Sequence, residues 1–179
     1  CNFVLYFKKM SMQPNMMNPA MRNGLILGVL FSTNFFLTVS GVPALALFSY
    51  LVTGLIIYFT HRYTVKFRDV DSGGSISFGR AYGFVLLQYI FATIISSFTK
   101  YFFLRFSKST FLEDMYNQNM ITLEQVLPTV TGEMYDAMEV LTNAQGYTIM
   151  AAWTNLLLAL ILGLIIAAMV KREKSPFDK

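Results

Sequence analysis

Four long apolar segments, separated by polar stretches, set the pattern of this sequence. They span residues 23–39, 43–60, 81–98 and 148–170, and an aromatic-rich extension at 100–106 follows the third. None of the four contains Asp, Glu, Lys or Arg, and about 20 apolar residues suffice for one helix to cross a membrane. The pattern therefore predicts an all-α integral membrane protein with a bundle of four transmembrane helices.

The first two segments are joined by a very short connection. Only Ser40, Gly41 and Val42 separate them, and Pro43 opens the second segment. Glycine enters turn conformations at little steric cost, and proline suits the first position of a helix because its missing N–H would be unpaired there. We therefore expect a tight antiparallel hairpin.

A polar insert at residues 99–147 separates the third and fourth segments and carries helix signals. Residues 110–113 (TFLE) fit the capping-box pattern, which predicts a short helix to about Met120. Residues 122–125 (TLEQ) repeat that pattern. Pro128 should end this second helix quickly, because proline cannot continue the hydrogen-bond ladder.

A third helix of the insert is predicted over residues 132–143, with Gly146 positioned to end it. One face carries Met134, Met138 and Leu141, and the other carries Glu133, Asp136 and Glu139. One interpretation is an acidic, methionine-lined cap outside the cytoplasm that contacts a partner or shields a membrane cavity. The alternative is a helix that rests on the bilayer surface and on the spans.

Basic residues are distributed unevenly between the two sides that four spans define. Eleven lie on the side of both termini and the 61–80 connection: Lys8, Lys9, Arg22, Arg62, Lys66, Arg68, Arg80, Lys171, Arg172, Lys174 and Lys179. The insert carries Lys100, Arg105 and Lys108, which we expect to act as anchors at the membrane interface. The positive-inside bias then places both termini in the cytoplasm.

This orientation divides the chain into three parts. Residues 1–22 form a cytoplasmic N-terminal segment, and residues 171–179 form a cytoplasmic tail. Residues 23–170 form the four-helix membrane domain, which includes the extracytoplasmic helical insert at 99–147.

Composition narrows the possible function classes. Of the 179 residues, 55% are hydrophobic and only 13% are charged, whereas ordinary soluble domains carry about 25% charged residues. This excludes a soluble enzyme, a secreted disulfide scaffold and a disordered chain. The formal charge of +4 is explained by membrane orientation, so we predict no nucleic-acid partner.

The cysteine and histidine counts limit the chemistry further. The single Cys1 cannot form an internal disulfide, and the single His61 cannot build a metal site without acidic help. We therefore predict no cofactor. A first-position Cys1 is also compatible with a lipidated terminus, but lipidation would place that end outside, against the charge bias.

The apolar segments hold no ionisable side chain that would mark a transport route or a proton relay. Their polar candidates are Thr154 and the amides of Asn34, Gln88 and Asn155. Amides can hydrogen-bond across helices in lipid, worth about 0.6–2 kcal/mol each. We interpret them as intramembrane packing contacts, with a substrate site as the alternative.

Two stripes of small residues predict close helix packing. Gly24, Gly28 and Ser32 recur at every fourth position of the first segment, as Ala159, Gly163 and Ala167 do in the fourth. Such spacing lets backbones approach one another closely, either within the bundle or against another subunit.

The 61–80 connection contains one pattern that is typical of catalysis. Asp69 and Asp71 have the spacing of the carboxylates that hold a divalent ion against a nucleotide diphosphate in glycosyltransferases. Those enzymes need a large nucleotide-binding domain, which this connection is too short to provide. Residues 72–75 (SGGS) predict a turn and lack the Lys-Ser/Thr of a phosphate-binding loop. We therefore predict no enzyme, and we expect the aspartates to balance Arg68 and Arg80.

Two basic clusters face the same predicted side of the membrane. Arg62, Lys66 and Arg68 follow the second segment, and Lys171 and Arg172 follow the fourth. They would suit anionic lipid headgroups, a polyprenyl phosphate or a cytoplasmic enzyme. Membrane topology alone also explains them.

Several features together resemble one known family. They are the short first hairpin, residues 73–83 (GGSISFGRAYG) before the third segment, the long insert, and residues 171–177 (KREKSPF). Over about residues 17–177 the chain resembles the bacterial membrane-protein family named domain of unknown function 4199. The resemblance implies a multi-pass protein of the bacterial cytoplasmic (inner) membrane without an established activity. It also suggests a partner, because genes of this family often lie beside a membrane-associated polyprenyl-phosphate glycosyltransferase.

Two functions follow as expectations. The preferred one is a non-enzymatic accessory or anchoring subunit of a membrane-associated enzyme, with membrane lipids and another membrane protein or a second copy as partners. The alternative is a small transporter or channel that acts as an oligomer. The transporter requires an open cavity on which Asn34, Gln88 and Asn155 converge, whereas the accessory subunit requires these amides to pair tightly in a closed bundle.

Overall fold

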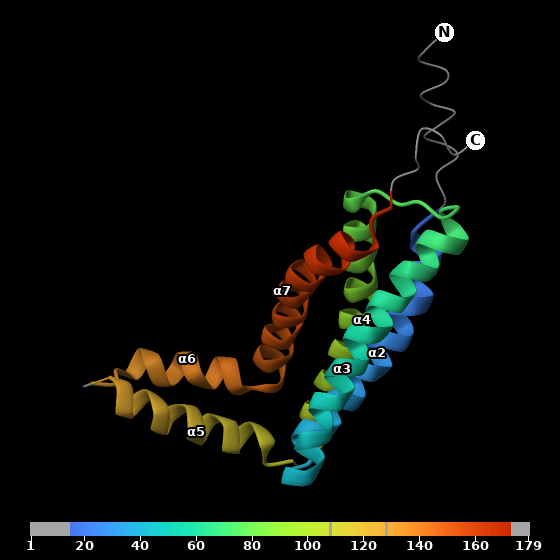
Figure 1. The fold of residues 1–179 in the computed structure, drawn as a ribbon. Helices are drawn as coiled ribbons and strands as arrows, with labels where there is room; N and C mark the ends of the chain where they lie inside the picture. The colour runs from blue at the N-terminus through green and yellow to red at the C-terminus, as the bar shows by residue number, and fades with distance from the viewer. Residues whose placement is uncertain (1–14, 108, 128, 173–179) are drawn as a thin grey trace.

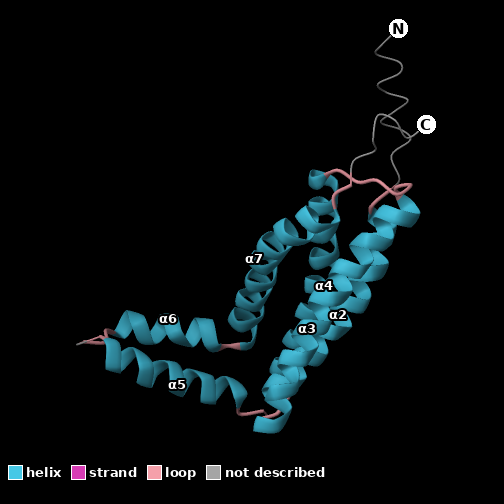
Figure 2. Cartoon of the chain, in the orientation of Figure 1, coloured by secondary structure: helices cyan, strands magenta, loops and turns pink. Residues whose placement is uncertain are grey.

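The computed structural model describes residues 15–107, 109–127 and 129–172, and these residues are almost entirely helical (Figure 2). The helices are α2 (Met17–Val39), α3 (Pro43–Lys66), α4 (Phe78–Phe106), α5 (Phe111–Val126), α6 (Gly132–Thr142) and α7 (Ala144–Val170). A π-helical segment, η1 (Phe67–Asp71), continues α3 without a break. The predictions made for Cys1, Lys8, Lys9, Lys108, Pro128, Lys174 and Lys179 lie outside the described residues.

Four of these helices are long and apolar enough to cross a membrane: α2, α3 with η1, α4 and α7. This confirms the prediction of an all-helical protein with four candidate spans. Each helix begins or ends a few residues beyond the predicted segment, and α4 extends through the whole aromatic-rich stretch to Phe106.

Helix α4 lies at the centre of the bundle (Figure 1). It packs extensively against both α2 and α7, while α3 rests mainly on α2. The start of α2 and the end of α7 lie at one end of the bundle, which we call the loop end. Helices α5 and α6 lie side by side at the opposite end, the insert end, and extend away from the bundle.

The turn between α2 and α3 has the predicted form. Gly41 adopts a φ of 68°, a left-handed conformation that side chains other than glycine rarely adopt. Val42 is extended, and Pro43 occupies the first turn of α3. The tight hairpin is therefore confirmed.

Small residues bring the backbones of the spans together. A β-carbon on Gly28 would stand 2.9 Å from Cβ of Ile95 in α4, and one on Gly163 would stand 2.9 Å from the ring of Tyr82. Ala159 and Ala167 are completely buried. Both small-residue stripes thus lie inside the bundle, and their closeness to α4 explains why α4 is its central helix.

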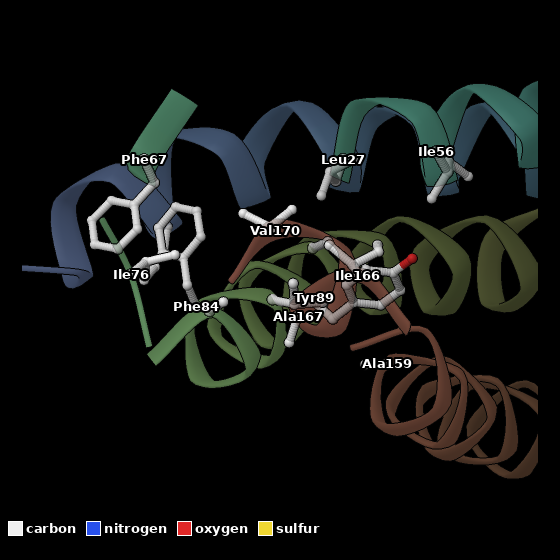
Figure 3. Packing of buried hydrophobic residues seen from close by; sticks show 14 of the residues in the cluster. Leu27, Ile56, Phe67, Ile76, Phe84, Tyr89, Ala159, Ile166, Ala167 and Val170 are labelled. Atoms are coloured by element: carbon white, nitrogen blue, oxygen red, sulfur yellow. The ribbon is translucent and has the colours of Figure 1, made fainter. Parts of the chain in front are cut away.

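The core at the loop end is aromatic (Figure 3). The rings of Phe67 and Phe84 stack with centroids 4.0 Å apart, beside the buried Ile76. The guanidinium carbon of Arg80 lies 5.7 Å from the centroid of Phe67. Arg80 therefore lies over an aromatic ring, and its predicted charge balance with the aspartates stays a prediction.

The connection predicted at 61–80 is mostly helix. Because α3 and η1 continue to Asp71, the nonhelical part is only 72–77. Ile76 and Arg172 form an isolated antiparallel bridge, with N···O distances of 2.9 and 3.0 Å. This bridge joins the connection to the end of α7.

The insert departs from the predicted capping pattern. Thr110 precedes α5, but its Oγ1 donates to Asp114 instead of the cap accepting a backbone N–H. Thr122 lies inside α5 and donates to the carbonyl of Gln118, so the two predicted helices are one. Asn143 caps α7, and Gly146 lies in the first turn of α7 instead of ending α6.

Candidate ligand-binding site

Lys100 is the unexpected residue of the bundle. It lies within α4, where only 7% of its surface is exposed, and its Nζ is 6.0 Å from the ring centroid of Phe35 in α2. The expectation of an interfacial anchor is therefore wrong for Lys100. Helix α4 continues past the predicted end of the third span, and Lys100 lies on the side of this continuation that faces the other helices. Arg105, one turn further along, is exposed as expected.

Lys100 lies in the wall of a cavity of about 300 Å³ toward the insert end of the bundle. Helices α2, α3, α4 and α7 each contribute to its wall. Its polar lining consists of Asn34, Thr38, Thr53, Tyr89, Lys100, Tyr147 and Asn155. A volume of this size can hold several water molecules or a small ligand.

Two of the three predicted amides meet in this cavity and are incompletely paired. Asn34 donates through Nδ2 to Oγ1 of Thr53 at a long 3.5 Å. Its buried Oδ1 and the buried Nδ2 of Asn155 have no hydrogen-bond partner among the described residues. A buried polar atom without a partner costs about 1–3 kcal/mol. The arrangement therefore leaves one buried acceptor and one buried donor without a partner beside the cavity.

The charge of Lys100 is also uncompensated. Within the described ranges, no Asp or Glu forms an ion pair with Lys100. The contact with Phe35 is at the outer limit of a cation–π interaction. A buried cation in a membrane helix is expensive unless something pairs with it. The cavity is thus suited to an anionic or strongly polar guest.

Gln88 does not join the other amides. It is completely buried in α4, and its Nε2 donates to Oγ1 of Thr64 in α3 at 3.4 Å. Gly24, Gly28 and Gly163 likewise lie at helix contacts and not in the cavity wall. The sequence signals therefore separate into packing residues and cavity residues.

The predicted basic residues lie at the loop end, where some of them form hydrogen bonds within the protein and others are exposed. Arg68 binds both carboxylate oxygens of Asp69, at 2.7 and 3.1 Å, and donates to the carbonyl of Val170 at 3.3 Å. Arg62 donates to the hydroxyl of Tyr58 within its own helix. The side chains of Lys66, Lys171 and Arg172 are exposed. Arg68 thus hydrogen-bonds to the last residue of α7, while Lys66, Lys171 and Arg172 are exposed.

In the part of the chain that the structure describes, no group of three or more His, Cys, Asp or Glu side chains could hold a metal ion. Asp69 and Asp71 lie in η1, and Asp69 is held by Arg68.

Fold and cavity together define a multi-pass helical membrane protein with a polar cavity among its spans. The chain belongs to the family described as a protein of unknown function (DUF4199), whose model matches residues 22–172. Comparisons with curated proteins and with solved structures gave no match.

Proposed function

We propose that this protein is a small transporter that binds an anionic substrate in the Lys100 cavity. The observation that carries the proposal is the buried, unpaired Lys100, which shares a cavity with Asn34 and Asn155. An ionisable residue inside a membrane span is by default a pointer to a substrate path. A bound anion would pair with the ammonium group and the free amide donor of Asn155.

The proposal includes the orientation of the chain in the membrane. The positive-inside bias supports a cytoplasmic loop end, with an extracytoplasmic insert formed by α5 and α6. The family resemblance supports the bacterial inner membrane. In this orientation the Lys100 cavity lies in the outer half of the bilayer.

Charge-selective thiol labelling of Asn155→Cys in a Cys1→Ser background tests the proposal. In proteoliposomes, a sulfonate-bearing methanethiosulfonate should react at least about tenfold faster than its trimethylammonium analogue, because Lys100 attracts anions into the cavity. The Lys100→Met variant should lose this preference. Labelling should occur from both sides of the membrane, since a transport site must be reached from each.

Leu157→Cys provides the matched control, because Leu157 is exposed on α7 and absent from the cavity wall. In lipid it should remain unreactive, as these reagents attack ionised thiols. Failure of Asn155→Cys to react, the same rate for both reagents, or access from one side only would contradict a transport site for anions.

A second candidate function is an accessory subunit of a membrane-associated enzyme, such as a polyprenyl-phosphate glycosyltransferase. The exposed basic side chains Lys66, Lys171 and Arg172 at the loop end support it, because they could contact an acidic surface or a lipid phosphate. Co-purification from native membranes in mild detergent tests it. A stoichiometric partner that is lost in a Lys66→Gln/Lys171→Gln/Arg172→Gln variant, but retained in Lys100→Met, would favour this role.

A further inference from the structure

A second hollow adjoins the Lys100 cavity. It has a volume of about 470 Å³ and lies in the angle between α7 and the α5–α6 pair. Its wall consists of Met115, Asn119, Met138, Leu141, Thr142, Tyr147, Met150, Ala151, Thr154 and Asn155. We call it the methionine groove. Tyr147 and Asn155 also line the Lys100 cavity, so the two spaces lie next to each other at these residues.

The two spaces differ in charge, because Lys100 lines the first and no charged side chain lines the methionine groove. The Lys100 cavity holds a cation and unpaired amide atoms, whereas Met115, Met138, Met150 and Leu141 make one wall of the groove apolar. Methionine side chains are unbranched and adaptable, so they fit a flexible hydrocarbon chain without a fixed shape. A molecule that spans the junction at Asn155 would have to be charged at one end and apolar at the other.

The charge selects among such molecules. A cationic amphiphile would meet Lys100 with the same sign, and an uncharged one would leave the ammonium group unpaired. A small inorganic anion would satisfy Lys100 but leave the groove unused. An anionic headgroup with one hydrocarbon chain satisfies both parts.

We infer that the substrate is a single-chain amphiphile with a carboxylate or phosphate headgroup, held with the headgroup at Lys100 and the chain in the methionine groove. This inference rests on the proposed function, because it names the chemical class of the anion that occupies the Lys100 cavity. The hydroxyl of Tyr147 and the amide of Asn155 then lie where headgroup and chain join.

Equilibrium binding of radiolabelled dodecyl phosphate to the full chain, in phosphatidylcholine nanodiscs, tests this inference. Unlabelled dodecyl phosphate should compete at least about tenfold better than inorganic phosphate, which lacks the chain, or dodecyl maltoside, which lacks the charge. Equal competition by inorganic phosphate would overturn the chain assignment. Equal competition by dodecyl maltoside would overturn the headgroup assignment.

Substitutions at two positions, Lys100 and Ala151, test the headgroup and chain parts of the site separately. Lys100→Met should weaken dodecyl phosphate binding at least about tenfold, and Lys100→Arg should retain most of it because the charge remains. Ala151→Trp, which places an indole in the groove, should weaken dodecyl phosphate binding but leave inorganic phosphate competition unchanged. Leu157→Trp on the exposed face of α7 is the matched control and should bind normally.

The outcomes also separate this inference from the proposed function. If Asn155→Cys shows the charge-selective labelling but dodecyl phosphate does not bind, an anion site remains and the amphiphile is wrong. If neither the labelling nor the binding is observed, both the proposed function and this inference are wrong. If Lys100→Met does not fold, the Lys100→Arg, Ala151→Trp and competitor measurements still decide the question.

Discussion

Gly24 of α2 lies directly against Phe91 of α4, so close that a β-carbon on Gly24 would stand 2.6 Å from Cβ of Phe91 and 2.8 Å from the carbonyl of Gln88. Neither neighbour is the movable end of a side chain. The two helices therefore cannot keep their present separation if residue 24 carries a side chain.

Gly24→Leu should consequently destabilise the bundle by roughly 1–3 kcal/mol or more, the usual range for overpacking. Thermal unfolding in detergent measures this loss. Gly54→Ala is the matched control, because Gly54 is also helical and no atom lies within 4 Å of its would-be β-carbon. It should be neutral or stabilising by up to about 1 kcal/mol, since alanine favours helix. Equal effects of both changes would show that α2 and α4 are not in this contact.

The Ile76–Arg172 bridge should respond to a proline. Ile76→Pro removes the N–H that donates to the carbonyl of Arg172, so we expect a loss of about 1–2 kcal/mol and faster amide exchange at the end of α7. Ser77→Pro is the control, because Ser77 already has a φ of −73° and its side chain makes no capping bond. Unchanged exchange at residues 170–172 in Ile76→Pro would contradict the bridge.

The N-terminus of α7 should depend on one side chain. Oδ1 of Asn143 accepts the N–H of Gly146 at 2.8 Å, so Asn143→Ala should cost about 1 kcal/mol. Thr131→Ala, at the corresponding position of α6, should have a smaller effect because Thr131 makes no side-chain capping bond. The free energy of unfolding of the two variants tests the difference, and a larger loss for Thr131→Ala would count against the cap.

A pH-dependent contact joins α5 and α6. Oη of Tyr135 donates to Oε1 of Glu124 at 3.1 Å, and this hydrogen bond to a carboxylate raises the pKa of Tyr135. The folded pKa lies above the ordinary value of about 10, so the contact stabilises the pair below that pH. Its contribution is lost as the pH rises through the raised pKa.

Glu124→Gln should therefore return the pKa of Tyr135 toward the ordinary value, as an NMR titration of ring-labelled tyrosine would report. Glu133→Gln is the control, since no hydrogen bond joins Glu133 to Tyr135 in the described structure. An unchanged pKa of Tyr135 in Glu124→Gln would show that α5 and α6 are not joined by this hydrogen bond.

The spans and the first hairpin were predictable because their signals are local. A run of apolar residues without charge, and a Gly41–Pro43 turn, specify their structure with little help from the rest of the chain. The small-residue stripes were predictable in position, but their partner was not. Only the packed bundle shows that both stripes face α4.

The burial of Lys100 was not predicted, because charge was used to set the end of the third span. The helical spacing of buried positions along α4 did indicate that Lys100 is buried. Tyr89, Thr93 and Ser96 are buried at spacings of three and four residues, and Lys100 continues that spacing. The signal at Thr110 does mark the start of α5, although its side chain makes no capping bond. The signal at Thr122 failed for the opposite reason, since a short sequence pattern was taken to specify a helix start inside what is one longer helix.

The central position of α4 has a consequence for how the chain is made. During synthesis the α2–α3 hairpin would enter the membrane before α4, and α7 would arrive last. Until α7 supplies Tyr147 and Asn155, the Lys100 ammonium group lacks one wall of its cavity. A chain arrested before α7 would therefore leave this charge less shielded than it is in the finished protein.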